Sequence, residues 1–197
     1  MTESNSLDLA SSVCDLGASQ GGLSYRGDDV AGPAGHSTYE ETAFVLLHAC
    51  LPARAALREF GAEVRAGAKV PAVASRTLRA APRSGDPVGL LQVAVATLAA
   101  EESFTSPTVE RGGMSGARPI GRMAGLVAAI HRLRQHQRPL APRAGLSLAG
   151  NVLYMMRGAL PVPAAGRGFD AALIVRADNE FIHQPSPLAS PRRPERH

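Results

Sequence analysis

Tryptophan is absent from this sequence of 197 residues, and aromatic residues make up only 4% of it. A core built mainly from aromatic rings is therefore excluded. Hydrophobic residues still account for 45% of the chain and charged residues for 19%, which is the composition of a globular protein rather than a disordered one. The length suits one domain, and we expect its core to consist of Ala, Leu and Val.

Cysteine is almost as scarce, because Cys14 and Cys50 are the two that the chain contains. They lack CxxC spacing and matching histidines, so two reduced thiols are expected rather than a disulfide or a metal site. A glycine-rich phosphate-binding loop is also missing from the sequence. We therefore predict neither a metal nor a bound cofactor.

Long hydrophobic runs are missing as well. No apolar segment approaches the roughly 20 residues that a membrane-spanning helix needs. The first nine residues include Glu3 and Asp8 and do not show the basic-then-apolar pattern of a signal peptide. We expect a cytoplasmic protein that does not bind a membrane.

The net charge is positive, with a formal value of +4. Basic residues are densest from His131 to Arg143 (HRLRQHQRPLAPR), and this stretch has no aromatic ring on which a nucleic-acid base could stack. A helix end followed by a loop is the preferred interpretation. Nucleic-acid binding is the weakest alternative for this protein, since only the charge supports it, and we expect none.

Glycines divide the segment from Val13 to Val30 into short apolar pieces, which is typical of small strands joined by tight turns. We predict an N-terminal β arm over residues 13–35. Residues 1–12 precede this arm and are predicted to be disordered. The Pro- and Arg-rich residues 183–197 show no periodicity and are predicted to form a disordered tail.

Residues 36–182 carry helical signals. Ser37 or Thr38 can cap a first helix, with Glu40 or Glu41 as the acid of a capping box. The spacing predicts five further helices, one after Pro52 that ends near Gly67 and Pro71, and others over Leu90–Ala100, after Pro119, over Leu148–Met156 and over Ala164–Val175. The fold class is therefore mainly α.

The pattern also predicts one surface loop and one core-facing stripe of side chains. The segment from Glu101 to Gly116 is polar and rich in glycine, so a surface loop is predicted there. In the helix after Pro119, one stripe at helical spacing is predicted to face the core, and it consists of Ile120, Met123, Val127, Ile130 and Leu133.

Five blocks of the sequence are informative because of the order in which they occur along the chain. They are Leu23–Gly27 (LSYRG), His36–Ala43 (HSTYEETA), Leu126–Arg132 (LVAAIHR), Asn151–Met155 (NVLYM) and Leu173–Glu180 (LIVRADNE). In this order they resemble the bacterial citrate synthase and 2-methylcitrate synthase family. The resemblance implies that residues 13–182 form part of the large helical domain of that family.

What the resemblance implies for function is a homodimeric enzyme that condenses acetyl-CoA or propionyl-CoA with oxaloacetate, giving citrate or methylcitrate without a metal or prosthetic group. It also implies that Asn179 occupies the position of the family's first catalytic histidine, because Arg176–Glu180 reads RADNE where the family has His-Ala-Asp-His-Glu. An amide can donate a hydrogen bond but cannot exchange a proton, so Asn179 is not expected to be a competent catalytic residue.

Two interpretations of function remain. In the first, the chain is a truncated and inactive member of the family, whose residues after Phe181 arose by a frameshift, since Ile182–Ser190 can be back-translated so that another frame reads Pro-Ser-Thr-Phe-Ala-Ala-Arg-Val. In the second, it is a non-catalytic interaction or dimerisation protein that uses the helical faces left uncovered.

Overall fold

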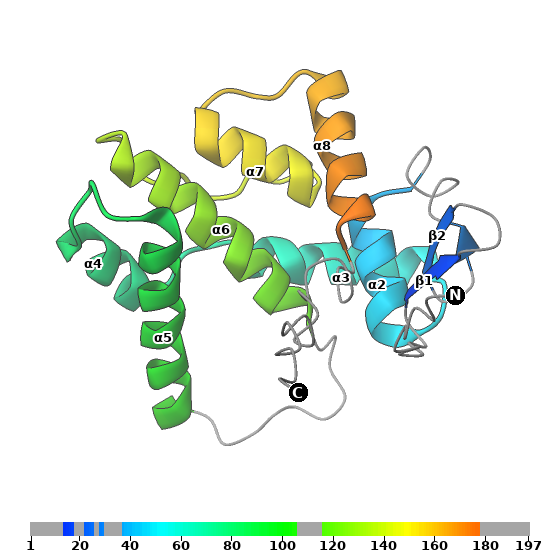
Figure 1. Ribbon diagram of the computed structural model, residues 1–197, viewed down its shortest axis with the longest axis horizontal. Coiled ribbons are helices and arrows are strands. Elements are labelled where there is room, and N and C mark those ends of the chain that lie inside the picture. Colours follow the sequence, from blue (N-terminus) through cyan, green and yellow to red (C-terminus); the bar gives the residue numbers. More distant parts are fainter. Residues whose placement is uncertain (1–13, 18–21, 26–27, 30–36, 106–115, 178–197) are drawn as a thin grey trace, which may run out of the picture.

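The computed structural model describes residues 14–17, 22–25, 28–29, 37–105 and 116–177, and these are mainly helical (Figure 1). Three short strands form an antiparallel sheet in the order β1-β2-β3, namely β1 (Cys14–Gly17), β2 (Gly22–Tyr25) and β3 (Asp28–Asp29). Cys14 lies opposite Tyr25 in this sheet, and Ser24 lies opposite Asp29. The prediction of a mainly α fold is confirmed, whereas a β arm over all of residues 13–35 stays a prediction.

Seven helices follow among the described residues. They are α2 (Tyr39–His48), α3 (Arg54–Gly67), α4 (Ala72–Ala80), α5 (Pro87–Thr105), α6 (Ala117–Arg134), α7 (Leu148–Arg157) and α8 (Pro163–Val175). No helix in this set is both long enough and apolar enough to cross a membrane. The segments predicted to be disordered, residues 1–12 and 183–197, lie outside the described residues.

The capping box at the start of α2 uses one of the two predicted pairs. Thr38 is the N-cap, and its hydroxyl accepts a hydrogen bond from the amide of Glu41, while the Glu41 carboxylate accepts from the amide of Thr38 at 2.9 Å. Ser37 adds a hydroxyl bond of 2.7 Å to the same carboxylate. Because Glu41 closes the box, Glu40 is left to contact other helices.

Two of the predicted boundaries are wrong. Helix α4 is absent from the prediction, because Pro71 is interpreted there as the end of the preceding helix. Pro71 is instead the N-cap residue of α4. A proline is tolerated at the start of a helix because its missing amide hydrogen would have no partner there. Helix α5 continues to Thr105, so the predicted surface loop from Glu101 begins five residues too early. Polar composition at the end of a helix cannot be distinguished locally from a loop.

Helices α3 and α6 cross at a point where their backbones touch directly. A Cβ atom added to Gly121 would overlap the carbonyl of Val64, and one added to Gly125 would overlap the carbonyl of Ala68. On the other helix, a Cβ atom at Gly67 would overlap the carbonyl of Arg118. Only glycine permits such an approach, and α3 and α6 accordingly make the most extensive helix–helix contact in the described fold.

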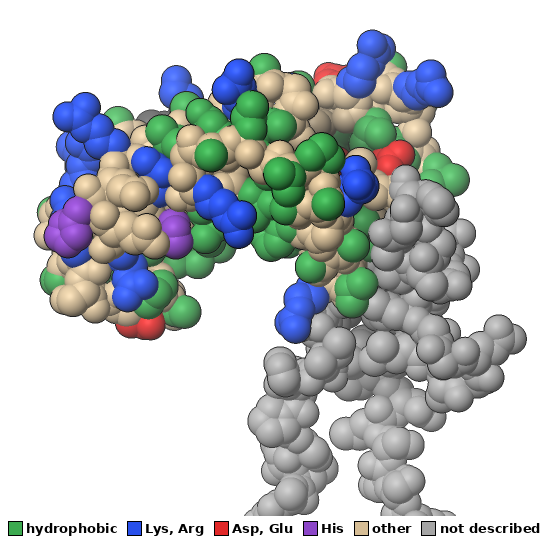
Figure 2. Space-filling view, turned by 90° about the horizontal axis from the view of Figure 1, so that it is seen from above, with side chains coloured by type: hydrophobic (Ala, Val, Ile, Leu, Met, Phe, Trp, Pro, Cys, Tyr) green, Lys and Arg blue, Asp and Glu red, His purple; other side chains and the backbone are tan. Residues whose placement is uncertain are grey.

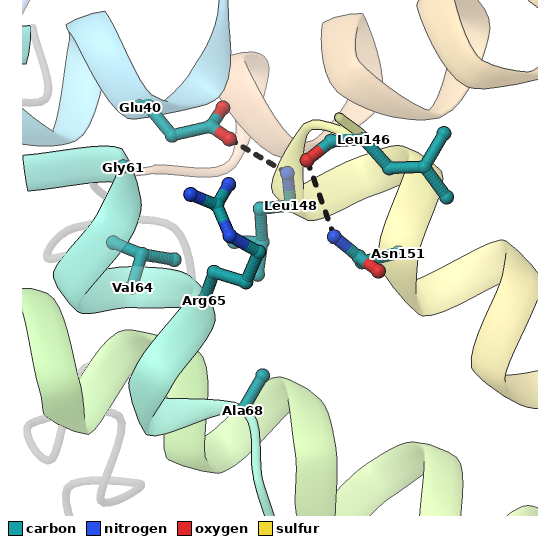
Figure 3. Close-up of a pocket in the computed structure, with 8 residues that line it drawn as sticks. All are labelled: Glu40, Gly61, Val64, Arg65, Ala68, Leu146, Leu148 and Asn151. Carbon is teal, nitrogen blue, oxygen red and sulfur yellow. Dashed lines mark hydrogen bonds between the residues drawn. The ribbon is translucent and has the colours of Figure 1, made fainter. Parts of the chain in front are cut away.

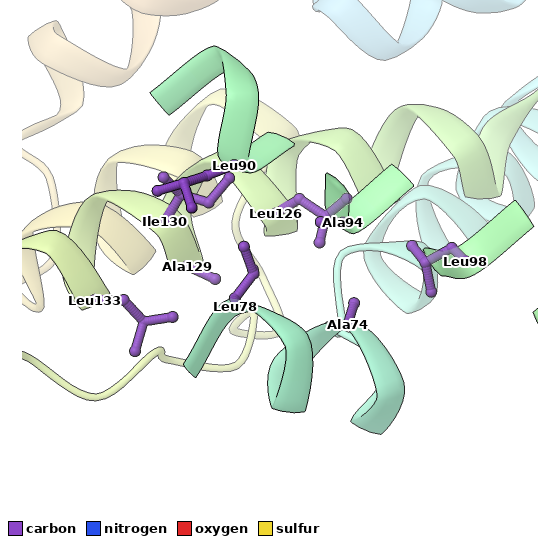
Figure 4. Close-up of a cluster of buried hydrophobic side chains, with 9 residues drawn as sticks. All are labelled: Ala74, Leu78, Leu90, Ala94, Leu98, Leu126, Ala129, Ile130 and Leu133. Atoms are coloured by element: carbon purple, nitrogen blue, oxygen red, sulfur yellow. The ribbon is translucent and has the colours of Figure 1, made fainter. Parts of the chain in front are cut away.

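The core lies on both sides of α6. Between α4, α5 and α6 it contains only aliphatic side chains (Figure 4), namely Ala74, Leu78, Leu90, Ala94, Leu98, Leu126, Ala129, Ile130 and Leu133. The second cluster joins α2, α3, α6 and α7 and includes two aromatic rings, Phe44 and Phe60, which meet edge to face with centroids 5.5 Å apart. Of the expected Ala, Leu and Val, the first cluster therefore buries Ala and Leu, and its remaining residue is Ile130 and not a valine.

The predicted core stripe of α6 is only partly correct. Ile130 and Leu133 are buried, but Met123 is 42% exposed and Val127 is 41% exposed. The reason is that the closest packing of α6 falls on Gly121 and Gly125, which carry no hydrophobic side chain and so give no signal in a hydrophobic pattern. Met123 and Val127 therefore lie away from both core clusters.

Candidate functional site

Glu40 links two helices at the most polar part of the interior. It is the second residue of α2, and its Oε1 atom accepts a hydrogen bond of 2.6 Å from the amide of Leu148, the first residue of α7. The first amides of a helix have no partner within it, and the positive end of the helix dipole favours an anion there. Glu40 thus caps α7 from a residue 108 positions away.

Asp170 makes the same kind of bond between α8 and α2. Its Oδ1 atom accepts a hydrogen bond of 2.9 Å from the amide of Tyr39, the first residue of α2. Each of the two carboxylates therefore satisfies an amide at the start of a helix other than its own. We call Glu40, Leu148, Asn151 and Asp170 the α2–α7–α8 junction.

Asn151 shapes the chain that enters α7. It is 2% exposed, its Oδ1 atom accepts from the amide of Arg143 at 2.7 Å, and its Nδ2 group donates to the carbonyls of Arg143 and Leu146 at 3.1 and 3.2 Å. The turn before α7 is thereby closed on a buried side chain. A buried amide with its bonds satisfied fixes local conformation, since an unpaired one would be costly.

The electrostatic environment of the junction raises the pKa of both carboxyl groups. Burial raises the pKa of Glu40 above its ordinary value, and the nearby charges of Asp170 and Glu41 raise it further, while the amide bond from Leu148 lowers it. Burial likewise raises the pKa of Asp170, against the lowering effect of the Tyr39 amide. Within the described part of the chain, the buried Oε2 atom of Glu40 has no hydrogen-bond partner.

A small pocket opens beside Glu40 (Figure 3), and the side chain of Arg65 on α3 points toward it. Its other lining residues are Gly61, Val64, Ala68, Leu146, Leu148 and Asn151. The volume of about 10 Å³ is that of roughly one water molecule, far below the ~300 Å³ of a typical ligand pocket. This pocket is therefore too small for a substrate-sized ligand.

The site residue that the sequence indicates, Asn179, lies outside the described residues. The structure describes the approach to it, because α8 ends at Val175 and is followed by Arg176 and Ala177. Asp170 bonds α8 to α2 five residues before α8 ends at Val175. In the residues that the structure covers, no group of three or more His, Cys, Asp or Glu could hold a metal ion, and Cys50 is exposed as a free thiol.

Sequence reasoning missed the roles of Asp170 and Asn151 and left Glu40 as an alternative cap of its own helix. One signal was available for Glu40. A capping box needs only one acid, and two adjacent acids follow Thr38, so one of them is available for a contact elsewhere. Asp170 gives no such signal, since its partner is an amide 131 residues away.

Comparison with solved structures identifies the class of fold. The chain is similar to citrate synthase from Thermoplasma acidophilum, solved as a ternary complex with carboxymethyl coenzyme A and oxaloacetate, with a TM-score of 0.79, 25% identity, and coverage of 88% of this chain and 46% of that one. Citrate synthase from Pyrobaculum aerophilum gives a TM-score of 0.73 at 28% identity, with coverage of 88% and 46%.

Sequence comparisons identify the family. A family model described as citrate synthase, C-terminal domain, matches residues 4–186. Curated relatives include citrate synthase from Deinococcus radiodurans, 34% identical over 83% of this chain and 44% of the relative, and 2-methylcitrate synthase from Mycobacterium tuberculosis, 31% identical over 81% and 40%. The chain belongs to the citrate synthase family, and it spans less than half the length of these relatives.

Proposed function

We propose that this chain provides the helical layer with which a citrate synthase-type enzyme holds its active-site segment, for the condensation of acetyl-CoA or propionyl-CoA with oxaloacetate. The observation that carries the proposal is the junction of α2, α7 and α8. There Asp170 bonds α8 to α2, and Arg176–Glu180 follows directly after the end of α8. Family membership and the names of the relatives supply the substrates.

The same proposal includes inactivity of the 197-residue chain by itself. Its basis is Asn179, since a histidine that stabilises charge only in the transition state contributes far more to rate than an amide that cannot transfer a proton. Incubated with oxaloacetate and either acyl-CoA, the chain is expected to release no coenzyme A above background, as measured with a thiol reagent. The Deinococcus radiodurans enzyme is the positive control, and thiol release that requires both substrates would contradict inactivity.

A pair of chimeras separates the helical layer from the substitution at Asn179. In the first, residues 37–177 of this chain replace the aligned part of the Deinococcus radiodurans enzyme, and the relative's own active-site segment follows. In the second, the replacement continues to Glu180 and so includes Asn179. We expect the first chimera to be active and the second to be slower by about a hundred- to ten-thousand-fold. An inactive but folded first chimera would contradict the proposed role of the layer.

A second candidate function is dimerisation, and exposed apolar side chains on α5 and α6 favour it. Val88 is 61% exposed and Val93 is 50% exposed on α5, and Met123 and Val127 are exposed on α6. Apolar side chains gathered on a surface mark interaction sites, and a homodimer is the assembly that the resemblance implies.

Light scattering after size exclusion tests the candidate dimer. We expect the chain to run as a dimer, and a Val93→Ser, Val127→Ser double variant to shift toward monomer. Leu160→Ser with Val162→Ser removes two other exposed apolar side chains (56% and 66% exposed) and serves as the matched control. A monomeric wild-type chain, or an equal shift in the control, would exclude these faces as the interface.

A further inference from the structure

Acidic residues are absent from one long part of the chain. From Arg111 to Phe169 the sequence contains nine arginines and no Asp, Glu or Lys. This part includes all of α6 and α7 and the first half of α8. Helices α2 and α3, in contrast, contain Glu40, Glu41, Glu59 and Glu63.

Arginine side chains bind backbone carbonyls where α6 and α7 end. Arg132 donates through Nε to the carbonyl of Arg138 at 2.6 Å and through Nη1 to the carbonyl of Met156 at 3.3 Å. Arg83, in the turn between α4 and α5, donates through Nη1 to the carbonyl of Leu133 at 2.7 Å. We call the surface so formed the basic end, and it comprises Arg83, His131, Arg132, Arg134, His136, Arg138 and Arg157.

Stabilisation of helix ends explains only two of these side chains. Arg83 and Arg132 bind carbonyls in the last turns of α6 and α7, where the negative end of the helix dipole attracts a cation. Arg134, Arg138 and Arg157 are exposed, and no carboxylate in the described residues pairs with them. Asp86, in the turn between α4 and α5, accepts a hydrogen bond of 2.8 Å from the amide of Gly89.

The backbone that carries the exposed arginines is well ordered by hydrogen bonds. The amides of Gln135 and His136 donate to carbonyls in the last turn of α6, and that of Gln137 donates to Arg132 at 2.8 Å. His136 adopts a left-handed conformation, with φ of 59°. Figure 2 shows blue Lys and Arg side chains around purple histidines at one end of the face, with few red acidic ones. A fixed backbone lowers the entropy lost on binding.

We propose that the basic end is a docking surface for an acidic protein segment rich in Asp and Glu. Arginine is suited to this partner because its planar fork donates two parallel hydrogen bonds to a carboxylate. Nucleic acid is the less favoured polyanion, since residues 131–143 include no Phe, Tyr or Trp for base stacking. The C-termini of α6 and α7 also meet here, whereas phosphate groups prefer helix N-termini.

The test uses fluorescence anisotropy of a labelled peptide of alternating Glu and Gly, titrated with the full chain at low salt and at about 0.15 M salt. We expect saturable binding that weakens with salt. Reversal of two exposed charges, Arg134→Glu with Arg138→Glu, is expected to weaken binding by about tenfold or more. The matched control, Arg54→Glu with Arg58→Glu, changes the net charge equally on exposed residues of α3 and is expected to change affinity less than about twofold.

Three outcomes would overturn the proposal. The first is an equal loss of affinity in the control, which would show that binding depends on the net charge of the chain and not on the basic end. The second is the absence of saturable peptide binding while circular dichroism shows a folded chain. The third is tighter binding of single-stranded RNA or duplex DNA than of the peptide at the same salt concentration, which would assign the surface to nucleic acid. The inference is independent of the proposed catalytic family role.

Discussion

The two sides of α6 are held by different kinds of contact. Toward α3, the backbones are in direct contact at Gly67, Gly121 and Gly125. Toward α4 and α5, the contact is made by leucine, alanine and isoleucine side chains that fill the space between three helices. At the α2–α7–α8 junction, in contrast, carboxylate–amide hydrogen bonds join the helices.

This difference determines how each side should respond to substitution. A backbone contact permits one spacing between two helices, so an added methyl group forces a whole helix to move. An aliphatic cluster accepts changes of shape if its volume is kept. The α3 side should therefore be sensitive to any side chain at its glycines, and the α5 side should be sensitive mainly to lost volume.

The largest effect is expected for Gly121→Ala. Its new Cβ atom would overlap the backbone carbonyl of Val64, so we expect the free energy of unfolding to fall by at least about 4 kcal/mol, close to the whole stability of a marginal domain. Urea denaturation followed by circular dichroism measures the change. In Gly61→Ala, on the facing helix, the new atom meets nothing within 4 Å, and this control should be neutral or stabilising. Equal losses in both variants would refute the backbone-contact argument.

Loss of volume on the other side should cost somewhat less. Leu126 is fully buried in the aliphatic cluster, and Leu126→Ala is expected to lower the free energy of unfolding by about 3 kcal/mol through lost burial and a residual cavity. Leu126→Met keeps the volume and should cost less than about 1.5 kcal/mol. If both variants unfold at the same urea concentration, the cluster is not packed as the structure describes.

A smaller, pH-dependent effect is expected at Glu40. Its pKa is raised in the folded state, so the fold binds the proton more tightly than the unfolded chain does. The resulting stabilisation is fully present below about pH 4.5 and is lost as the pH rises through the raised value. Glu40→Gln keeps an oxygen acceptor for the Leu148 amide without this titration, so its stability relative to wild type should increase between pH 4 and 7.

Thermal melts across this pH range measure the effect. Glu59→Gln, at an exposed position on α3, is the matched control. Glu40→Ala removes the acceptor altogether and is expected to lower the free energy of unfolding by about 1–2 kcal/mol. A Gln variant that loses stability relative to wild type as the pH rises would show that the ionised carboxylate is the favoured form.

The smallest effect is expected at Gly168 in α8. A Cβ atom there meets nothing within 4 Å, and the residue lies inside a helix at an exposed position. Gly168→Ala should therefore stabilise the protein by about 0.5–1 kcal/mol, because alanine loses less backbone entropy than glycine on entering a helix. An unchanged or lower melting temperature would indicate that this part of α8 is not helical in solution.

Local patterns predicted most of the helices but not the contacts between them. Helical spacing after Pro52 predicted α3, because a buried hydrophobic face, here with Phe60 and Val64, repeats with the helical period. The same reasoning placed Met123 and Val127 in the core, where the structure shows them exposed. The face of α6 that packs most closely contains glycines, and a pattern of hydrophobic side chains cannot register their approach to another backbone.

The α2–α7–α8 junction was beyond prediction for a related reason. Glu40 and Asp170 bind backbone amides 108 and 131 residues away, and every residue except proline has an amide. Side-chain identity at the partner position therefore carries no information. Asn179 is the opposite case, since ordered blocks of sequence single it out, and it stays a prediction because it lies outside the described residues.

The crossing of α3 and α6 also constrains the order of events during folding. It joins the two ends of a segment of nearly 50 residues that contains α4 and α5, and closing a flexible loop of that length costs about 3–4 kcal/mol of chain entropy. Helices α4 and α5 are neighbours in sequence and pack on each other, so they can pair locally first. A preformed pair shortens the effective loop, and the rate at which α3 finds α6 should then depend on Leu78 and Leu90, which belong to the aliphatic cluster and not to the glycine crossing.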